Sequence, residues 1–506
     1  MNESNHPSSD AYFLDGEADD IGHELRLFLN RDAYADRWDV VERQNEPVKH
    51  PANPVVMPDQ PWEHSVGLPN VIYDAEHSVY RMWYANYDTG KWGGGRDLEG
   101  HKRTPYMMSY AESSDGVHWT KPLLDKTPYI GFDKTNIVFT GHTMACEFHV
   151  MPTPEHLASN GRFMLWYCDT VPPSAPAVFV AYSDDGIDWR PHSTEPVYEK
   201  ALDVEQCPIY DERRDLWLLY ARPHALAANE QRYTGENVRT RISVTVSGDL
   251  KTWTPARQVL VPDELDRGDT DADRGYFFDR MSVIRHGNQY VGFLSVHPRH
   301  GAGRGYIELT SSADGFRWHR SVIRQPFIGS GPDGQWDAGH TWMVPTVVPV
   351  GHWLNMYYVG ASRPWRTRFP DNTRAIGLVR IRKDRFVGQY ADVNGGWLLS
   401  REVKITGNRL LINCSPEHRA FNQQHHGYVL VELLDRTQGV YAEQHLDGFG
   451  QDDCDPIRAD EYGHVVSWKG NPDLSALAGR NVYIRFYLKS AYLFGFRFAD
   501  AGPSAG

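Results

Sequence analysis

Short runs of apolar and aromatic residues, separated by turn-forming residues, recur along the chain and predict β-strands. Five of these runs are strongly aromatic: "YRMWYANY" (80–87), "RFMLWYCD" (162–169), "DLWLLYAR" (215–222), "QYVGFLSV" (289–296) and "LNMYYVGA" (354–361). A second β-rich run follows four of them, as in "YMMSYAE" at 106–112. Helical periodicity is scarce, so the pattern predicts an all-β protein.

A phrase rich in Ser, Asp, Gly and Trp follows these pairs of runs. It reads "SSDGVHW" (113–119), "SDDGIDW" (183–189), "SGDLKTW" (247–253) and "SADGFRW" (312–318), with its tryptophans 70, 64 and 65 residues apart. Asp-Gly and Gly-Asp pairs favour tight turns between strands. We interpret the phrase as a structural turn whose Trp packs between neighbouring sheets, and not as a catalytic motif.

The spacing of the phrase indicates the architecture. A period near 65 residues fits a propeller blade of four strands with long loops. A fifth, weaker copy, "RKDRF" at 382–386, brings the count to five blades. We expect the segment "RWDVVERQNEPV" (37–48) to supply the outer strand that closes the ring with the last blade.

The phrase disappears after about residue 390, although strand-like segments such as "NVYIRFYLKSAYLFGFRF" (481–498) continue. The predicted fold is therefore a five-bladed β-propeller followed by a C-terminal β-sandwich. Its expected parts are a disordered N-terminal segment (1–20), the propeller (21–390) and the sandwich (391–506). A chain of 506 residues is too long for one ordinary core, which agrees with two domains.

Charge and composition narrow the classes of partner and the expected compartment. Lys and Arg number 52 against 66 Asp and Glu, and this net charge of −14 argues against nucleic acid or an anionic membrane as the main partner. We see neither a secretory signal nor a run of 18 apolar residues, so we predict a cytoplasmic protein. The cysteines lack CxxC spacing, which predicts reduced thiols: Cys146, Cys168, Cys207, Cys414 and Cys454.

Acidic and histidine residues precede each aromatic run, where the innermost strand of a blade would border a central channel. In blade order they are Asp59, Glu63 and His64; Glu147 and His149; Asp203 and Glu205; Asp279 and Arg280; Asp337 and His340. Carboxylates crowded into one pocket push their pKa values apart, so one can donate a proton while another stays ionised. For each acid alone, a solvated loop or a salt bridge stays the alternative.

Aromatic residues near these positions could stack on sugar rings or simply pack in the core: Trp62, Trp92, Trp336 and Trp342. With phrases such as "YAESSDGVHWTKP" (110–122) and "VYRMWYANYD" (79–88), the chain resembles the family-32 glycoside hydrolases and the related families 43 and 68. The likeness covers roughly residues 40–500 and is closest to uncharacterised bacterial family-32-like proteins.

This resemblance implies three acids on the inner strands of blades one to three. The nearest matches here are Glu63 in "PWEHSVGLPN", Glu147 in "CEFHV" and Glu205 in "DVEQCP", with Asp203 competing for the third place. The fructosidase motifs Trp-x-Asn-Asp-Pro and Arg-Asp-Pro are absent.

The implied activity is a glycoside hydrolase or transglycosylase acting on a furanoside or on a pentose- or fructose-containing oligosaccharide. The catalytic candidates are Glu63, Glu147, Asp203 and Glu205. The substrate-binding candidates are Trp62, His64, His149, Asp279, Trp336, Asp337 and His340. No cofactor or metal is expected, the partner is carbohydrate, and homo-oligomerisation stays open. A non-catalytic propeller that binds sugar or protein is the alternative, since fold alone does not establish activity.

Overall fold

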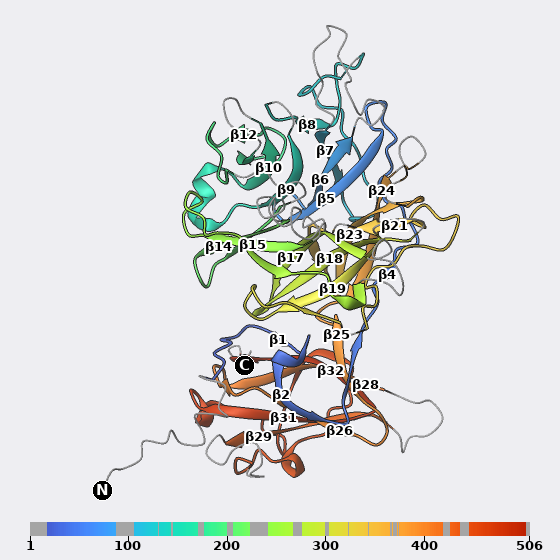
Figure 1. The fold of residues 1–506 in the computed structure, drawn as a ribbon. Helices are drawn as coiled ribbons and strands as arrows, with labels where there is room; N and C mark the ends of the chain where they lie inside the picture. The colour runs from blue at the N-terminus through green and yellow to red at the C-terminus, as the bar shows by residue number, and fades with distance from the viewer. Residues whose placement is uncertain are drawn as a thin grey trace. The chain divides into compact units, whose positions relative to one another are not determined.

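The computed structural model is nearly all β, and the chain divides into two compact units (Figure 1). The five-sheet unit is Asn45–Lys383, and the two-sheet unit combines Met1–Gln44 with Asp384–Gly506. The structure describes residues 18–87, 106–129, 131–142, 145–170, 177–199, 206–222, 241–266, 276–298, 303–321, 323–342, 344–364, 367, 372, 374–417, 426–435 and 445–501. Trp92, Asp203, Glu205 and nearly all of the predicted disordered segment 1–20 lie outside these residues.

The described part of the five-sheet unit forms five antiparallel sheets. The strands of the first two sheets are β5 (Ser65–Asp74), β6 (Val79–Tyr87), β7 (Tyr106–Ser113) and β8 (Ile137–Phe139), then β9 (Cys146–Pro152), β10 (Phe163–Asp169), β11 (Ala177–Ser183) and β12 (Arg190–Pro191). The third sheet contains β13 (Cys207–Asp211), β14 (Leu216–Ala221), β15 (Ile242–Ser247) and β16 (Arg257–Leu260). Four of the aromatic runs form the second strand of their sheet, and the fifth run forms strand β23 (Trp353–Ala361) of the fifth sheet, which takes the equivalent place.

The fourth and fifth sheets follow the same plan. Their strands are β17 (Tyr276–His286), β18 (Gln289–Pro298), β19 (Tyr306–Ser312) and β20 (His319–Arg320), then β21 (His340–Trp342), β22 (Val347–Val350), β23 (Trp353–Ala361), β24 (Arg374–Arg382) and β4 (Val48–Lys49). Strand β4 comes from the start of the unit and pairs with β24 at its end. The fifth sheet therefore joins the two ends of the unit.

The repeated Ser-Asp-Gly-Trp phrase forms a tight turn in each copy, as the sequence predicted. In the first copy the Ser113 hydroxyl accepts a hydrogen bond from the Gly116 amide, and the Asp115 carboxylate accepts bonds from the Val117 and His118 amides. Gly116 has φ +72°, a conformation that glycine adopts without strain. The same bonds recur around Asp185, Asp249 and Asp314.

The tryptophan of each phrase packs on a neighbouring sheet. Trp189 contacts Trp83 of the first sheet, and Trp253 contacts Trp166 of the second. Trp318 contacts Tyr220 of the third sheet, while Trp119 of the first sheet contacts Tyr357 of the fifth. A backbone bridge between Gly305 and His340 joins the fourth sheet to the fifth, so the sheets contact one another in cyclic order.

The two-sheet unit encloses its own apolar core, to which both sheets contribute. Its first sheet contains β3 (Val41–Gln44), β25 (Val387–Ala391), β32 (Ala491–Ala499), β28 (Arg409–Pro416), β30 (Glu461–Val465) and β1 (Arg26–Leu27). Its second sheet contains β2 (Tyr34–Trp38), β26 (Gly396–Ser400), β31 (Asn481–Lys489), β27 (Val403–Lys404) and β29 (Tyr428–Asp435). Phe28, Ile412, Phe486 and Phe496 are among the residues buried between them.

The structure differs from the predicted domain boundary at residue 21. Strands β1, β2 and β3 pair with β32, β26 and β25, so the described residues up to Gln44 belong to the two-sheet unit. Of the segment 37–48 that was expected to close the ring, the end at Val48 joins the fifth sheet, where it pairs with Arg380. Local sequence pattern could not separate these neighbouring strands, because all of them are short, and β2, β3 and β4 are also partly exposed.

Helices are few and short. In the described part of the chain they include the 3-10 turns η1 (Arg31–Ala33), η3 (Glu155–Asn160), η5 (Glu264–Asp266), η8 (Gln451–Asp453) and η9 (Ser475–Leu477). Among the described residues, no helix has the length and apolar character needed to cross a membrane. None of the five cysteines, all within the described residues, forms a disulfide.

Candidate functional site

The innermost strands of the five-sheet unit surround a common cavity of about 550 Å³. Strands β5, β9, β13, β17 and β22 each contribute residues to its lining, which is mostly aliphatic and proline side chains. His149 and Arg285 are among its polar members. The first strands of the sheets are distant in sequence but meet around one space. From the sequence, we expected the innermost strands to border such a channel.

Three of these strands, β5, β9 and β17, carry a β-bulge at equivalent places in their sheets. On β9, His149 pairs with Trp166 and Cys146 pairs with Cys168, so Glu147 and the next residue face a single partner. On β17 the bulge contains Asp279 and Arg280. Bulges commonly turn a side chain toward an active site.

The backbone of Glu147 adopts φ +55°, which is rare and costly for a residue with a side chain. Gln206 holds this conformation from the next sheet, because its side-chain amide donates a 3.0 Å hydrogen bond to the Glu147 carbonyl. The amide oxygen of Gln206 in turn accepts from the Cys168 thiol. Since Gln206 is fully buried, it fixes the position of Glu147 firmly.

The bulged residues form an ion-pair network in which one guanidinium joins two carboxylates. Arg280 Nη1 lies 3.2 Å from Glu147 Oε2, and Arg280 Nε donates a 3.0 Å bond to Asp279 Oδ2. Arg222 Nη1 lies 3.5 Å from Asp279 Oδ1, and His297 Nε2 lies 3.8 Å from Asp279 Oδ2. We call these five residues, with His340, the acid–guanidinium cluster.

The two carboxylates of this cluster have different surroundings. Burial alone would raise the pKa of Asp279, but electrostatic interactions with Arg280, His297 and Arg222 hold it well below its usual range. Asp279 is therefore ionised at neutral pH. The Glu147 side chain keeps 16% of its surface exposed, whereas Asp279 keeps 2%. Glu147 is thus the carboxylate of the pair that a ligand can reach.

Two buried imidazoles complete the cluster. The ring centres of His297 and His340 are 4.1 Å apart, and the ring centre of His340 lies 4.3 Å from that of Trp342. Burial lowers the pKa of His297 to about 4, although the neighbouring Asp279 opposes this shift. Burial and His297 also lower the pKa of His340. Both histidines are neutral at pH 7 and can serve as hydrogen-bonding groups.

The first and fifth sheets border the same network. Burial raises the pKa of Tyr106 on β7 well above its ordinary value. The negative charge of Glu147 raises this pKa further and is the second largest cause. The guanidinium of Arg374 on β24 lies 4.9 Å from the centre of the Trp342 ring. Residues from all five sheets therefore gather around Glu147 and Asp279.

Glu63 and Trp62, predicted from the first blade, belong to a different network. The buried Glu63 carboxylate accepts hydrogen bonds of 2.6 Å from Tyr84 Oη and from Lys121 Nζ. Asn136 donates to the same Tyr84 oxygen, and the Trp62 indole donates to the Asn136 side chain. The bulge of β5 carries Leu68 and Pro69, so the first sheet has no acid where the second and fourth have theirs.

The remaining predicted residues lie in several places. Asp337 pairs with Lys49 and accepts a 2.8 Å bond from Tyr358, whose ring Trp336 contacts. His64 is half-buried just before β5, and His149 lines the cavity. The cluster therefore unites Glu147, Asp279, Arg280 and His340 from the residues named in the sequence. Asp203 and Glu205 fall outside the described residues.

Three members of the site were not predicted from the sequence: Arg222, His297 and Gln206. Arg222 directly follows β14, and His297 lies near the end of β18, which are aromatic second strands. In an antiparallel pair, the end of the second strand lies beside the start of the first. From the sequence, we considered polar residues at the channel only at the start of each first strand. Polar residues at the end of each second strand would have added Arg222 and His297.

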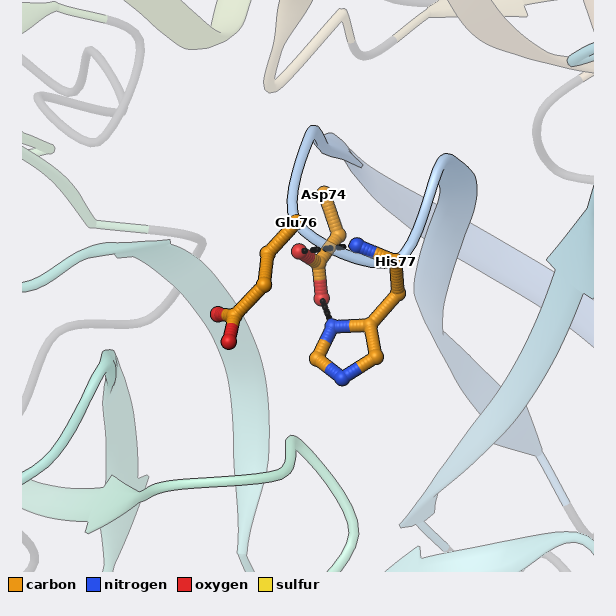
Figure 2. A group of neighbouring side chains, drawn as sticks. All are labelled: Asp74, Glu76 and His77. Atoms are coloured by element: carbon orange, nitrogen blue, oxygen red, sulfur yellow. Dashed lines mark hydrogen bonds and ion pairs between the residues drawn. The ribbon is translucent and has the colours of Figure 1, made fainter.

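One group of side chains, Asp74, Glu76 and His77, has metal-ligand composition (Figure 2). Its buried Asp74 carboxylate already accepts bonds from Arg81 Nε, Arg162 Nη2 and His77 Nδ1, each 2.9 Å long. The hydrogen bonds from Arg162, Arg81 and His77 hold the pKa of Asp74 well below its usual range despite its burial. Asp74 therefore ties the turn between β5 and β6 to its neighbours, and a metal ion would have to displace two guanidinium groups.

Comparisons with known proteins give distant similarities. No protein-family model matches the chain. An uncharacterised protein of Mycobacterium tuberculosis strain H37Rv, and one of strain CDC 1551, are each 28% identical over 176 residues. The match covers 33% of this chain, and the chain spans about half the length (50%) of these curated relatives.

Similar solved structures include an N-acetylgalactosamine deacetylase from F. plautii in complex with blood group B trisaccharide. It is 17% identical, and the match covers 67% of this chain and 96% of that one, with a TM-score of 0.42. A thermostable family-43 glycoside hydrolase is 15% identical, with coverages of 64% and 92% and a TM-score of 0.43. A β-1,2-mannobiose phosphorylase from Listeria innocua is 12% identical; the match covers 67% of this chain and 97% of that one, with a TM-score of 0.44.

Proposed function

We propose that the chain is a carbohydrate-active enzyme that cleaves a glycosidic bond at the acid–guanidinium cluster. The observation that supports this proposal most directly is the Arg280 guanidinium, which joins Glu147 and Asp279 at two equivalent bulges. Cleavage of a glycosidic bond requires paired carboxyl groups, one to protonate the leaving oxygen and one to attack or to activate water. The five sheets would be the blades of a propeller, and the two-sheet unit a β-sandwich.

Glu147 is proposed as a reacting carboxylate, because it is exposed to a ligand while its backbone is held in place. Asp279 would remain ionised and orient Arg280, whose charge stabilises the ionised form of Glu147 before the reaction. Asp203 and Glu205 stay the predicted partners of Glu147, whereas both oxygens of Glu63, the third predicted acid, are engaged by Tyr84 and Lys121. A carboxyl separation of about 5 Å would imply retention, and about 6.5–9.5 Å would imply inversion through a water molecule.

The substrate class follows from the resemblance seen in the sequence. We propose a furanoside or a pentose- or fructose-containing oligosaccharide. Beside the cluster, the partly exposed Tyr106 offers a flat ring that suits the C–H face of a sugar. His297, His340 and Trp342 are fully buried and would support the cluster from behind.

A substrate screen tests the proposal. Aryl β-fructofuranoside, α- and β-arabinosides, galactosides and xylosides are incubated with the wild-type chain, Glu147→Gln and Asp279→Asn. Asp188→Asn is the matched control, because Asp188 is an exposed acid of the same unit that pairs with Lys126. Turnover lost in both cluster variants and kept in Asp188→Asn supports the proposal. Turnover that survives Glu147→Gln overturns it, and binding of a sugar with no turnover favours the non-catalytic alternative.

A further inference from the structure

A row of aromatic side chains crosses the second sheet of the two-sheet unit. Trp38 on β2 pairs in register with Trp397 on β26, and Trp397 pairs with Tyr487 on β31. These strands are neighbours in the sheet (Figure 1). Since directly paired residues lie on the same face, the three aromatic side chains form one continuous row. Leu430 on β29 pairs with Tyr487 but packs against the core of the unit.

The row lies on the face of the sheet that points away from the core. On β31, Ile484, Phe486 and Leu488 are buried in the core of the unit, while Arg485 and Tyr487 alternate with them. Trp38 is 59% exposed, and Trp397 and Tyr487 are partly exposed. An exposed row of large apolar side chains usually marks a binding surface.

A polar pair lies directly beside the row. Glu432 Oε1 accepts a 2.9 Å bond from Arg485 Nη1 and a 2.8 Å bond from Tyr487 Oη. The Arg485 guanidinium also lies 5.3 Å from the centre of the Trp397 ring. The charges of Arg485 and Glu432 cancel, so this part of the face carries no net charge.

We propose that this row, Trp38, Trp397 and Tyr487, binds a neutral carbohydrate chain. Aromatic rings stack on the apolar C–H faces of sugar rings, and the Arg485–Glu432 pair holds the Tyr487 ring in place for such stacking. Three neighbouring strands place the row over about 10 Å, since adjacent strands are about 4.8 Å apart. This length accommodates more than one sugar ring. The site is independent of the proposed reaction and lies in the other unit.

The exposed area argues against a second copy of the chain as the occupant. Large aromatic side chains bury about 150–250 Å² each when fully covered, and those of the row are already partly buried. Their remaining surface falls well below the roughly 800 Å² per partner that a stable protein interface buries. A carbohydrate chain needs no such area.

Affinity gel electrophoresis in gels containing levan, linear arabinan, arabinoxylan or galactomannan tests the proposal. All proteins carry Glu147→Gln so that substrate cleavage does not alter the gel. Trp38→Ala and Trp397→Ala are compared with Trp353→Ala, a control at a tryptophan of the five-sheet unit that is 40% exposed. We expect retardation by at least one polysaccharide, with an affinity reduced about tenfold by each row variant and unchanged by the control.

Three results would overturn the proposal. They are no retardation in any gel, equal retardation of Trp38→Ala and Trp353→Ala, and a wild-type dimer that Trp38→Ala converts to a monomer in sedimentation velocity. Because Trp38 is largely exposed, Trp38→Ala should fold normally even if Trp397→Ala does not. The assay records binding alone, so failure of the proposed enzymatic function leaves this result unaffected.

Discussion

Glu147 Oε2 lies 3.2 Å from Arg280 Nη1, although 133 positions separate the two residues. Each residue lies in a β-bulge of an innermost strand, one in the second sheet and one in the fourth. The contact depends on two bulges that each turn side chains toward the same network. The backbone conformation, the burial and the charge of the residues at these bulges can therefore be tested separately by substitution.

The first prediction concerns the backbone of Glu147. Because its φ is +55°, glycine fits this position better than alanine does. Glu147→Gly should therefore be more stable than Glu147→Ala by about 1 kcal/mol in chemical denaturation, since both variants lose the same side chain. Glu112 on β7 does not have a positive φ, so at this position the alanine variant should be more stable than the glycine variant. The same order at both positions would contradict the assigned conformation.

A second prediction follows from His297. Its folded pKa is lowered to about 4 from an ordinary value of 6.5, so the unfolded chain takes up a proton first as the pH falls. The free energy of unfolding should therefore decrease between pH 6.5 and 4, with a slope of up to about 1.4 kcal/mol per pH unit from this group. Above pH 6.5 this contribution is constant.

His297→Asn should reduce that slope, while substitution of the exposed His192 by Asn should leave it unchanged. Urea denaturation at half-unit pH steps measures both. A slope that His297→Asn does not alter would show that this imidazole titrates normally in the folded protein.

The third prediction separates two roles of Glu63. Its carboxylate is buried against Lys121, which also pairs with the exposed Asp59, so Glu63→Gln removes the buried half of this ion pair and should cost about 2 kcal/mol of stability. The double variant Glu63→Gln/Lys121→Met removes both charges and should recover much of the loss. Because both carboxylate oxygens already have partners, we expect turnover per folded molecule to persist in the double variant. Its loss at restored stability would support the catalytic role predicted from the sequence.

The fourth prediction concerns the repeated turn. The buried Ser113 hydroxyl accepts from the Gly116 amide and donates to Asp115, so Ser113→Ala should lower stability by about 1 kcal/mol. The adjacent Ser114 is exposed, and Ser114→Ala should have little effect. Thermal melting compares the two. Turnover per folded molecule should be the same in both, because the turn serves structure; a selective loss of turnover in Ser113→Ala would refute this interpretation.

Much of the fold could be predicted from local sequence pattern. The aromatic runs form strands, and the phrase around Asp115 forms a turn with its Trp on a neighbouring sheet, because these features depend on residues close in sequence. The positions of β1, β2 and β3 could not be predicted. Their partners lie more than 340 residues away, and short strands carry little pattern of their own.

The candidate site was predicted only in part, for a similar reason. Glu147, Asp279 and His340 precede aromatic strands, and their convergence follows from the repeat. No sequence pattern indicated that bulges at Glu147 and Asp279 select these residues, or that Tyr84 and Lys121 engage Glu63. Bulges and buried ion pairs arise from contacts between strands, and these become visible only in the folded chain.

The most direct test of the central claim separates turnover from binding at Glu147. On the first aryl glycoside that the wild-type chain cleaves, kcat and the dissociation constant are measured for Glu147→Gln and for the surface control Asp188→Asn. If Glu147 is a reacting carboxylate, kcat should fall by about 10²–10⁴-fold in Glu147→Gln while the dissociation constant changes little. A wild-type kcat in Glu147→Gln would contradict the claim that the acid–guanidinium cluster is the reaction site.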